Sequence, residues 1–594
     1  MRRLAWVGVL LLGMVEIFPV EEVKPGMHGV LRTVLKGTEV SEIPFVVEGV
    51  YPNFYPGVPV VMIRLQGIGE ETGVVAGMSG SPVFIDGKLL GALAYGFGFF
   101  VREPLAGVTP FSAMLAAGRF AEERRAAVAV PWDAEERRAV LEGIFRRDPG
   151  PLVKALRRRL PRPAAPEGWQ WIPLALRTPP LREEARQLLE ELLQGTPLRL
   201  VTQGGAARAE GAPLEAGAPL VVPLVWGDLD LAAVGTVTWV EGDTVYGFGH
   251  PFFNVGAIRL PLAQGWILKT VASDLLSFKI GFTGKVVGAL VQDRLHAVVG
   301  KMGAPYDAFP VEIAVQRTDG QVVRFLYQVA QDEAIRVLNA SLVGLTSMLS
   351  VMSATMDNAP ALLEGEVALQ LRGQRGLQWT QRYGVYAGPR PSFNVGELDL
   401  WIDLVFTLFS LYYNPFRPLN VDGLTVRLRV LPWEPAWEVE RVEAGRTRLR
   451  RGEPLTLRVT LRRYGQEERR QEVLRISTAD LPAGSYRVTL QDGFVRRWNA
   501  ELEKRFPETL EEFLRREQDL LQYRRDRLYL SLWRRVPGLR VKGQTYPALP
   551  ATVRRQIGRA RGQVQVLLRE EVVPWEGNFV GAGSVYFEVK EETP

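Results

Sequence analysis

The chain has 594 residues, more than one hydrophobic core usually supports, so several domains are expected. Hydrophobic residues make up 47% and charged residues 23%, a globular balance that excludes a mostly disordered chain and a polytopic membrane protein. Cysteine is absent, which excludes disulfides, thiolate metal sites and a cysteine nucleophile. With only three histidines, a histidine-rich metal site is not expected, and no motif indicates a cofactor.

The net charge of +6 arises from 72 basic and 66 acidic residues, which is weak for this length. Arginines cluster in residues 121–162 and 446–555, where they alternate with glutamate. Such mixing is typical of a solvated, ion-paired surface, so nucleic acid is not expected as a partner.

The N-terminus carries Arg2 and Arg3 followed by an apolar run from Leu4 to Val15. A basic start and a short apolar run are typical of a secretory signal, and the run is too short to span a bilayer comfortably. We therefore expect residues 1–20 to be a signal peptide or an N-terminal membrane anchor. The protein is then exported to the periplasm, the cell envelope or the exterior. The alternative is a buried N-terminal strand or helix.

Residues 21–117 read as β structure, with short apolar runs separated by glycine and proline. Asp86-Gly87 predicts a hairpin turn between two of these runs, and a helix is expected over Pro110–Arg125. Residues 118–215 are rich in arginine and proline and predict a helical insert or linker. The expected strands are Glu42–Val50, Val58–Leu65, Val83–Ile85 and Leu89–Tyr95; the expected helices of the insert are Asp133–Arg146, Pro151–Leu160 and Leu181–Leu193.

The β pattern returns over residues 216–320, and residues 321–432 predict an α+β domain with helices at Asp332–Ser353 and Val395–Tyr413. Residues 433–500 predict a β-sandwich-like module. Residues 501–594 predict a module of one helix, Glu508–Leu530, and closing strands. The fold class expected from this pattern is mainly β with α insertions.

The most specific motif is Gly77-Met78-Ser79-Gly80-Ser81-Pro82, which lies between two apolar runs. Glycines on both sides of a serine allow a sharp turn that exposes the hydroxyl and gathers backbone N–H groups. Acyl transfer needs both a presented nucleophile and donors for the developing oxyanion, here Ser79 with the N–H groups of Gly77 and Met78. The alternative is an ordinary Gly/Ser turn.

A serine nucleophile needs a base, and histidine is the usual one. His28 and His296 lie in an ordinary turn and a strand-like run. His250 lies in Tyr246-Gly247-Phe248-Gly249-His250-Pro251-Phe252, where glycine and proline place the ring in a constrained loop at a strand end. We therefore expect Ser79 Oγ and His250 to face each other across a cleft, within or near hydrogen-bond reach.

The run TGVVAGMSGSPVFIDGKLLGALAY, residues 72–95, resembles the serine motif of the SpoIVB-type peptidases, family S55. The run GTVTWVEGDTVYGFGH, residues 235–250, resembles the second signature of that family, and residues 287–300 look like the sequence that follows it. This resemblance implies an exported serine endopeptidase acting on protein or peptide, with Ser79 as nucleophile and His250 as general base. It implies a trypsin-like double β-barrel made of residues 21–117 and 216–320, and no cofactor or metal.

Two features depart from the family. The serine half precedes the histidine half, so the two halves are permuted, which a site defined by geometry tolerates. The aspartate position of the family, about fifteen residues before the serine, falls on Arg64 or Leu65, and neither can orient an imidazole. The possible substitutes are Glu70, Glu71, Asp274 and Asp293. A catalytically impaired envelope scaffold or protein-binding module is therefore the alternative function, and the oligomeric state is not predicted.

Overall fold

The computed structural model describes residues 15–97, 103–120, 134–145, 148–178, 180–181, 183–202, 210–274, 276–355, 361–385, 395–503, 507–541, 544–546 and 562–591. The chain divides into two units. The first takes in residues 1–127, 156–308 and 327–339, and the second takes in residues 128–155, 309–326 and 340–594.

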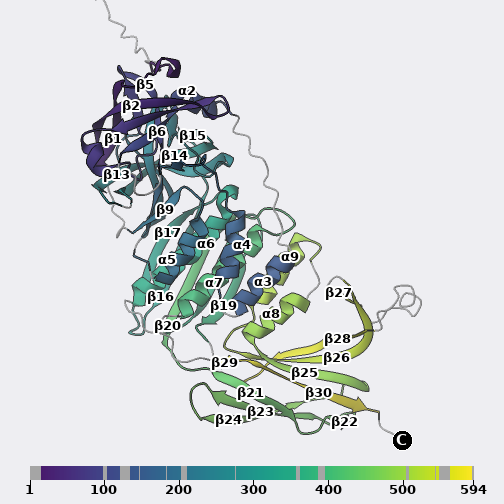
Figure 1. The fold of residues 1–594 in the computed structure, drawn as a ribbon. Helices are drawn as coiled ribbons and strands as arrows, with labels where there is room; N and C mark the ends of the chain where they lie inside the picture. The colour runs from purple at the N-terminus through teal and green to yellow at the C-terminus, as the bar shows by residue number, and fades with distance from the viewer. Residues whose placement is uncertain are drawn as a thin grey trace, which may run out of the picture. The chain divides into compact units, whose positions relative to one another are not determined.

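Six strands of the first unit form a closed antiparallel barrel, in the order β4-β1-β2-β3-β6-β5 and back to β4 (Figure 1, purple). Its core holds apolar side chains such as Leu31, Phe45 and Ile63. The predicted hairpin is confirmed, because Asp86 (φ 48°) and Gly87 (φ 75°) form the two-residue turn between β4 and β5. The strands are β1 (His28–Lys36), β2 (Glu39–Tyr55), β3 (Val58–Leu65), β4 (Pro82–Ile85), β5 (Lys88–Gly96) and β6 (Leu105–Pro110).

The segment before β1 packs on this barrel. Phe18 N–H donates to Leu89 O at 3.0 Å, and Leu89 N–H donates to Glu16 O at 2.8 Å. The described end of the expected 1–20 leader therefore belongs to the barrel, whereas residues 1–14, on which the signal prediction rests, lie outside the described residues. The short helices of this region are η1 (Val20–Glu22), α1 (Ile68–Thr72) and α2 (Phe111–Gly118).

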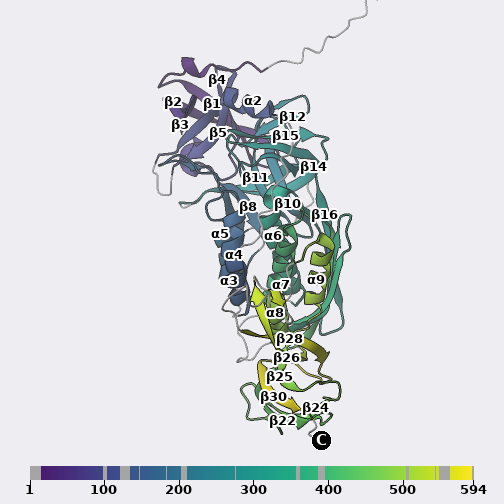
Figure 2. The ribbon, with the colours of Figure 1, turned by 90° about the vertical axis from the view of Figure 1, so that its right-hand side faces the viewer.

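Six further strands of the first unit also pair in a ring, because β10 pairs with both β11 and β13. The order is β10-β13-β14-β15-β12-β11, and every pair is antiparallel (Figure 2). The strands are β10 (Pro219–Gly227), β11 (Leu231–Glu241), β12 (Thr244–Gly247), β13 (Gly256–Val271), β14 (Phe278–Arg294) and β15 (Ala297–Met302).

The arginine-rich region contains three short strands in addition to the expected helices. β7 pairs with β5, and β8 pairs with β11 and β9. Sequence reading missed β8 because its Arg177 is 2% exposed and pairs with Asp230 at 2.8 Å, so a charged residue stands at a core position. The elements are α3 (Ala134–Phe145), α4 (Gly150–Arg159), β7 (Gln170–Trp171), β8 (Leu174–Thr178), α5 (Glu183–Leu193) and β9 (Leu198–Thr202).

The second unit begins with a mixed sheet in which β18 lies between β19 and β20, and β20 runs parallel to β16. Helix α7 is buried along its described length and contacts β18 and β19. Among the described residues one helix, Glu333–Thr355, is long and apolar enough to cross a membrane, and 83% of its most apolar window is buried. In chain order the elements over residues 308–432 are β16 (Ala308–Gln316), β17 (Val322–Ala330), η2 (Glu333–Ile335), α6 (Arg336–Thr355), β18 (Ala361–Leu371), β19 (Leu377–Tyr383), α7 (Val395–Tyr412) and β20 (Val421–Pro432). Residues 327–339, which include η2, are counted with the first unit.

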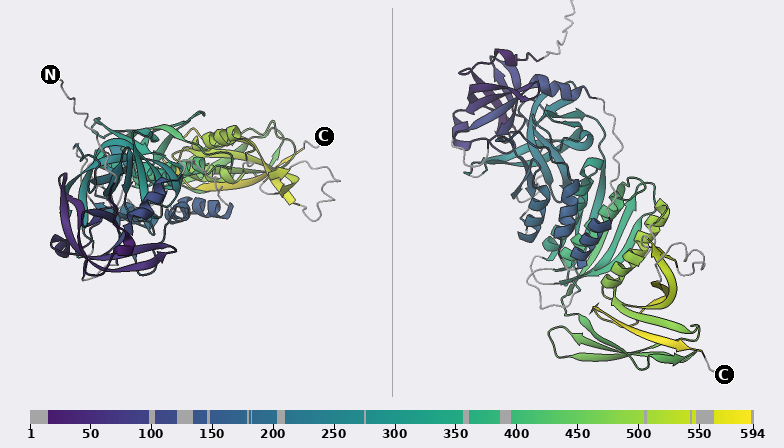
Figure 3. Two further views of the ribbon diagram at one scale, coloured as in Figure 1. Left: turned by 90° about the horizontal axis from the view of Figure 1, so that it is seen from above. Right: turned by 45° about the vertical axis from the view of Figure 1, so that its right-hand side comes forward.

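The C-terminal strands form two layers around one core (Figures 1 and 3). One sheet has the order β24-β23-β21-β29 and the other β22-β30-β25-β26-β27, with β28 beside β26. The modules expected at 433–500 and 501–594 therefore share a core, because β25 pairs with both β26 and β30. The strands are β21 (Trp437–Ala444), β22 (Arg448–Arg450), β23 (Leu455–Arg463), β24 (Arg469–Ile476), β25 (Gly484–Asp492), β26 (Leu528–Val541), β27 (Gln544–Tyr546), β28 (Gly562–Val572), β29 (Phe579–Val580) and β30 (Ala582–Lys590).

Two helices lie between β25 and β26 in the sequence: α8 (Gly493–Glu503) and α9 (Leu510–Leu521). The helix expected over Glu508–Leu530 therefore ends at Leu521, and the last residues of that range already belong to β26. Thr509 caps α9, because its hydroxyl accepts from Glu512 N–H at 3.2 Å.

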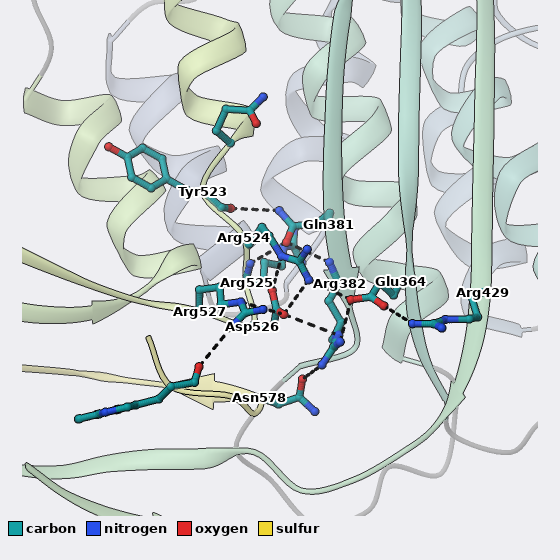
Figure 4. Close-up of polar contacts among 12 residues, drawn as sticks. Glu364, Gln381, Arg382, Arg429, Tyr523, Arg524, Arg525, Asp526, Arg527 and Asn578 are labelled. Atoms are coloured by element: carbon teal, nitrogen blue, oxygen red, sulfur yellow. Dashed lines mark hydrogen bonds and ion pairs between the residues drawn. The ribbon is translucent and has the colours of Figure 1, made fainter. Parts of the chain in front are cut away.

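Glu364 of β18 connects the mixed sheet of β19, β18 and β20 to the turn after α9 (Figure 4). Its carboxylate accepts from Arg382 at 2.7 Å, Arg429 at 2.6 Å and Arg524 at 2.9 Å. Arg524 also pairs with Asp526 at 2.8 Å. Burial disfavours the charged form, but the hydrogen bonds from the three guanidinium groups lower the pKa of Glu364 to about 2.

We expect Glu364→Gln to lower the free energy of unfolding by about 2 kcal/mol at pH 7, because it removes a charged acceptor from three arginines. The folded-state pKa lies below the ordinary value, so the stabilisation by Glu364 is present at neutral pH. It fades as the pH falls from about 4.5 toward 2. Urea unfolding between pH 2.5 and 7 measures this, with Glu366→Gln, an exposed glutamate of the same strand, as control. Equal stability losses for the two variants would contradict it.

Candidate active site

The serine motif forms a tight loop before β4. Gly77 (φ 99°) and Gly80 (φ 94°) adopt left-handed backbone conformations that other residues rarely accept. A Cβ atom at Gly80 would also collide with Thr236 O and Phe248 N. Glycine at position 80 is therefore required both by its backbone angle and by the close approach of the histidine loop.

Hydrogen bonds from β11 hold this loop in place. Thr236 N–H donates to Ser79 O at 2.8 Å, and its hydroxyl donates to Gly77 O at 2.9 Å. The hydroxyl of Thr238 donates to Gly80 O at 2.7 Å. Thr236 and Thr238 are 0% exposed, so these bonds form away from water, where leaving a carbonyl unpaired costs about 1–3 kcal/mol.

The histidine lies just beyond β12, in a loop with a strained backbone. Phe248 has φ 66°, which a bulky residue rarely adopts and which costs about 1–3 kcal/mol. The hydroxyl of Thr109, from β6, donates to Gly249 O at 2.7 Å. A strand of the first barrel, β6, therefore helps to fix the histidine loop, which follows β12 of the second ring of strands.

The two side chains singled out from the sequence meet. Ser79 Oγ is hydrogen-bonded to His250 Nε2, although the residues are 171 positions apart. The same hydroxyl contacts Phe248 O at 2.9 Å. Because a hydroxyl carries one proton, the imidazole nitrogen and the Phe248 carbonyl compete for it.

The expected open cleft is absent in this state. Ser79 and His250 are both 0% exposed. The ring of Trp171 lies over His250, with ring centroids 5.4 Å apart and planes 33° apart, and Ile172 O lies 3.1 Å from His250 Nε2. The pair is therefore covered by residues 171 and 172, which come from the region predicted to be a linker.

The protonation of His250 is set by burial and by backbone carbonyls. Burial lowers its pKa to about 4, against the hydrogen bonds to Pro251 O and Ile172 O, which raise it. His250 Nδ1 lies 2.8 Å from Pro251 O, which assigns the proton of the neutral ring to Nδ1 and leaves Nε2 as acceptor. At neutral pH the ring is therefore uncharged, as a base for Ser79 must be.

No carboxylate contacts the imidazole among the described residues. Asp293 instead accepts from the N–H groups of Phe252 at 2.8 Å and Phe253 at 2.7 Å, so it holds the loop that follows His250. Burial raises the pKa of Asp293 to about 6, against these hydrogen bonds, which lower it.

The other positions considered for an orienting acid lie elsewhere. Arg64 pairs with Glu48 at 2.7 Å, and Leu65 is buried in the core of the first barrel. Glu70, Glu71 and Asp274 line a cavity instead. The place of an acid behind the ring is thus taken by the carbonyl of Pro251.

The expected oxyanion donors are partly engaged. Gly77 N–H donates to Pro173 O at 3.2 Å, and Met78 N–H donates to Val75 O at 2.9 Å. The N–H of Ser79 has no acceptor among the described residues. An oxyanion role for Gly77 and Met78 stays a prediction, which for Met78 requires the turn to Val75 to open.

A cavity of about 610 Å³ has residues 169–173 as one of its walls, and Trp171 and Ile172 of this wall also cover the Ser79–His250 pair. Acidic side chains gather on its lining, and the aromatic rings of Phe97, Trp169 and Trp171 contribute apolar surface. Arg199 is the basic residue of the lining. The cavity is large enough for several residues of a peptide.

Sequence reading missed a buried lysine behind the serine loop. Lys279 of β14 is 0% exposed, and its Nζ donates to Thr33 Oγ1 at 2.7 Å. Ser81 Oγ donates to the same hydroxyl at 3.1 Å. Burial lowers the pKa of Lys279 to about 7. A lysine in a long amphipathic strand gave no signal that its side chain would turn inward.

The other two histidines do not join the site. His28 is exposed at the start of β1, and His296 packs edge-on against Tyr55 with ring centroids 5.4 Å apart. In the described part of the chain, no group of three histidine, aspartate or glutamate side chains could hold a metal ion.

Comparison with known proteins leaves the family open. No family model matches the chain, and no curated protein matches it. One solved structure, staphylococcal superantigen-like protein 4, aligns with 31% of this chain and 91% of its own, at 9% identity and a TM-score of 0.12. Such a low score carries no argument about fold or function.

We expect Asp293→Asn to remove a pH dependence of stability. The folded-state pKa of Asp293 lies above the ordinary value, so its charged form is disfavoured on folding and the free energy of unfolding falls as the pH rises from about 4 to 6. The variant should gain about 2–3 kcal/mol relative to the parent across that window. Urea unfolding at pH 4 to 7 tests this, with the exposed Asp274→Asn as control, and parallel pH profiles of parent and Asp293→Asn would refute it.

Proposed function

We propose that this chain is a serine endopeptidase of the SpoIVB, S55, type that acts on protein or peptide. The observation that carries the proposal is the hydrogen bond between Ser79 Oγ and His250 Nε2 in a pocket built from two separate loops. The serine motif in residues 72–95 and the Gly-His motif in residues 235–250 resemble the two signatures of this family, but they occur in the opposite order along the chain. The exported location predicted from residues 1–15 is part of the same proposal.

In the proposed reaction, Ser79 Oγ attacks the peptide carbonyl carbon while His250 Nε2 takes the hydroxyl proton. The imidazolium that forms is stabilised by its Nδ1–H bond to Pro251 O, 2.8 Å away. The N–H of Ser79 then donates to the oxyanion, joined by Gly77 N–H once Pro173 O has left it. His250 then returns the proton to the leaving amine. In the second half of the reaction, His250 takes a proton from a water molecule that attacks the acyl-enzyme ester, and it returns this proton to Ser79 Oγ as the acid product leaves.

Two rings of antiparallel strands support a trypsin-like double barrel with its halves in permuted order. Ser79 precedes β4 of one ring, and His250 follows β12 of the other. The hydroxyl of Thr109 in β6 binds the histidine loop, and the hydroxyls of Thr236 and Thr238 in β11 bind the serine loop, so each loop is held by a strand of the other ring. A site at a junction of two barrels is defined by geometry and not by chain order.

The second candidate is a catalytically impaired scaffold or protein-binding module of the envelope. Two observations favour it: the pair is 0% exposed, and a carbonyl stands where a triad has its acid. A missing orienting carboxylate can cost a factor on the order of 10⁴ in rate.

Labelling with a fluorophosphonate separates the two candidates. We expect the folded protein to be labelled at Ser79. Ser79→Ala should abolish labelling, and His250→Ala should slow it by a factor of about 10²–10⁴ because the hydroxyl loses its base. Ser81→Ala is the matched control, since Ser81 lies in the same loop but donates to Thr33. Absence of Ser79-dependent labelling both in the folded parent and in folded forms from which Trp171 and Ile172 no longer cover the site would support the scaffold.

The pH dependence of labelling tests the state of His250. The imidazole must be neutral to accept a proton, so the rate should fall as the pH drops through about 4 and stay level from pH 5 to 8. Labelling rates between pH 3 and 8 measure this midpoint. A midpoint near 6.5 in the parent protein would show that His250 is not buried as described.

A further inference from the structure

We propose that residues 170–173, Gln-Trp-Ile-Pro, fill the peptide-binding groove of the candidate active site, and that an extended peptide of the same pattern binds there when this segment leaves. This inference extends the proposed peptidase function. The expected chemistry at Ser79 rests on that proposal, whereas the expected binding of the peptide does not. We call residues 170–173 the covering segment.

The backbone of the covering segment is bound as an added strand. Trp171 and Gln170 pair antiparallel with Tyr95 and Gly96 of β5, and Ile172 N–H donates to Ala94 O at 2.9 Å. β7 is the last strand of its sheet path, so the segment extends the sheet at its edge. Extended peptides bind to proteins in the same way, by main-chain hydrogen bonds to a strand edge.

Two carbonyls of the covering segment point at the groups that the proposed chemistry uses. Pro173 O accepts from Gly77 N–H at 3.2 Å, in the serine loop. Ile172 O lies 3.1 Å from His250 Nε2. Pro173 O therefore occupies an expected oxyanion donor, and Ile172 O lies beside the imidazole nitrogen that accepts the Ser79 proton, which is where the carbonyls of a bound peptide would lie.

The side chains of the covering segment define the pattern of the ligand. Trp171 is 8% exposed and packs against the rings of Tyr95, at 5.0 Å between ring centroids, and His250. Ile172 is 1% exposed and packs into the core of the first barrel. Gln170 is exposed. The groove therefore accepts an aromatic residue, an aliphatic residue and then proline.

Apart from the two-residue strand β7 that it contains, the covering segment can leave from its N-terminal side without unfolding a helix or strand. Residues 161–169, which precede it, form neither and are mostly half-buried or exposed. The cavity of about 610 Å³ lies alongside and would join the groove once the segment has moved. Removal of Trp171 and Ile172 would also bring water to His250, which moves its pKa up from about 4 toward the ordinary 6.5.

Binding of a dye-labelled peptide with the sequence Gly-Trp-Gln-Trp-Ile-Pro-Leu, residues 168–174, tests the inference by fluorescence anisotropy. The double variant Trp171→Ala/Ile172→Ala should bind it at least tenfold more tightly than the parent, because the groove is no longer filled by its own chain. Gln170→Ala, which changes an exposed side chain of the same segment, should bind like the parent, and a scrambled peptide should not bind.

We call a protein whose covering segment has been displaced an opened form; the double variant is one, and a second is needed in case the double variant misfolds. A specific protease site inserted between Glu167 and Gly168, in the exposed turn, allows the folded chain to be cut there without replacing a core residue. The cut protein should also bind the peptide. Ser79 labelling should rise at least tenfold in both opened forms, and its acid midpoint should move upward from about 4.

The outcomes separate the two proposals. Peptide binding to an opened form together with faster Ser79 labelling supports both. Peptide binding without Ser79 labelling in any form supports the covering segment and overturns the peptidase. If both opened forms keep the circular dichroism spectrum of the parent and neither binds the peptide, the covering segment is refuted, whatever the labelling shows.

Discussion

The hydrogen bonds from Thr236 and Thr238 to the serine loop are the constraint on which the candidate site depends. They fix the backbone on both sides of Ser79 against β11, the strand that pairs with β12 and so positions the histidine loop. Gly80 is needed because nothing larger fits between the loops. Once this junction forms, the contact between Ser79 and His250 follows from the backbone, since each side chain has little room to turn elsewhere.

Burial then decides the electrostatics of the site. The imidazole, the Lys279 amine and the Asp293 carboxyl all lie out of water, and in each case burial is the largest influence on the pKa. Burial favours the neutral form of each group: near pH 7 the imidazole of His250 is uncharged, whereas the pKa of Lys279, about 7, and that of Asp293, about 6, place their titration close to neutral pH. Carbonyls, not a carboxylate, accompany His250, which suits a ring that is neutral at rest and charged only while it holds the proton of Ser79.

The sequence predicted some elements well and others poorly, for physical reasons that particular residues show. Asp86-Gly87 was recognisable because a two-residue turn with positive φ needs such residues. Strand β8 was missed because Arg177 is buried against Asp230. The role of Asp293 could not be seen, since it acts on backbone N–H groups more than thirty positions away. Trp169 and Trp171, two tryptophans in an arginine- and proline-rich stretch, were the one signal that this stretch contacts a core.

By itself the sequence determined the mainly β class, the serine loop and the histidine loop, because each depends on local chemistry: glycines for a tight turn, alternating apolar residues for a strand. Only the tertiary structure decided which residues surround the pair. It put a carbonyl behind His250, placed β25, β26 and β30 in one sheet, and laid Trp171 and Ile172 against His250. Except for the carbonyl of the neighbouring Pro251, these contacts join positions far apart in the chain, and their energies come from burial and pairing that exist only after the strands have assembled.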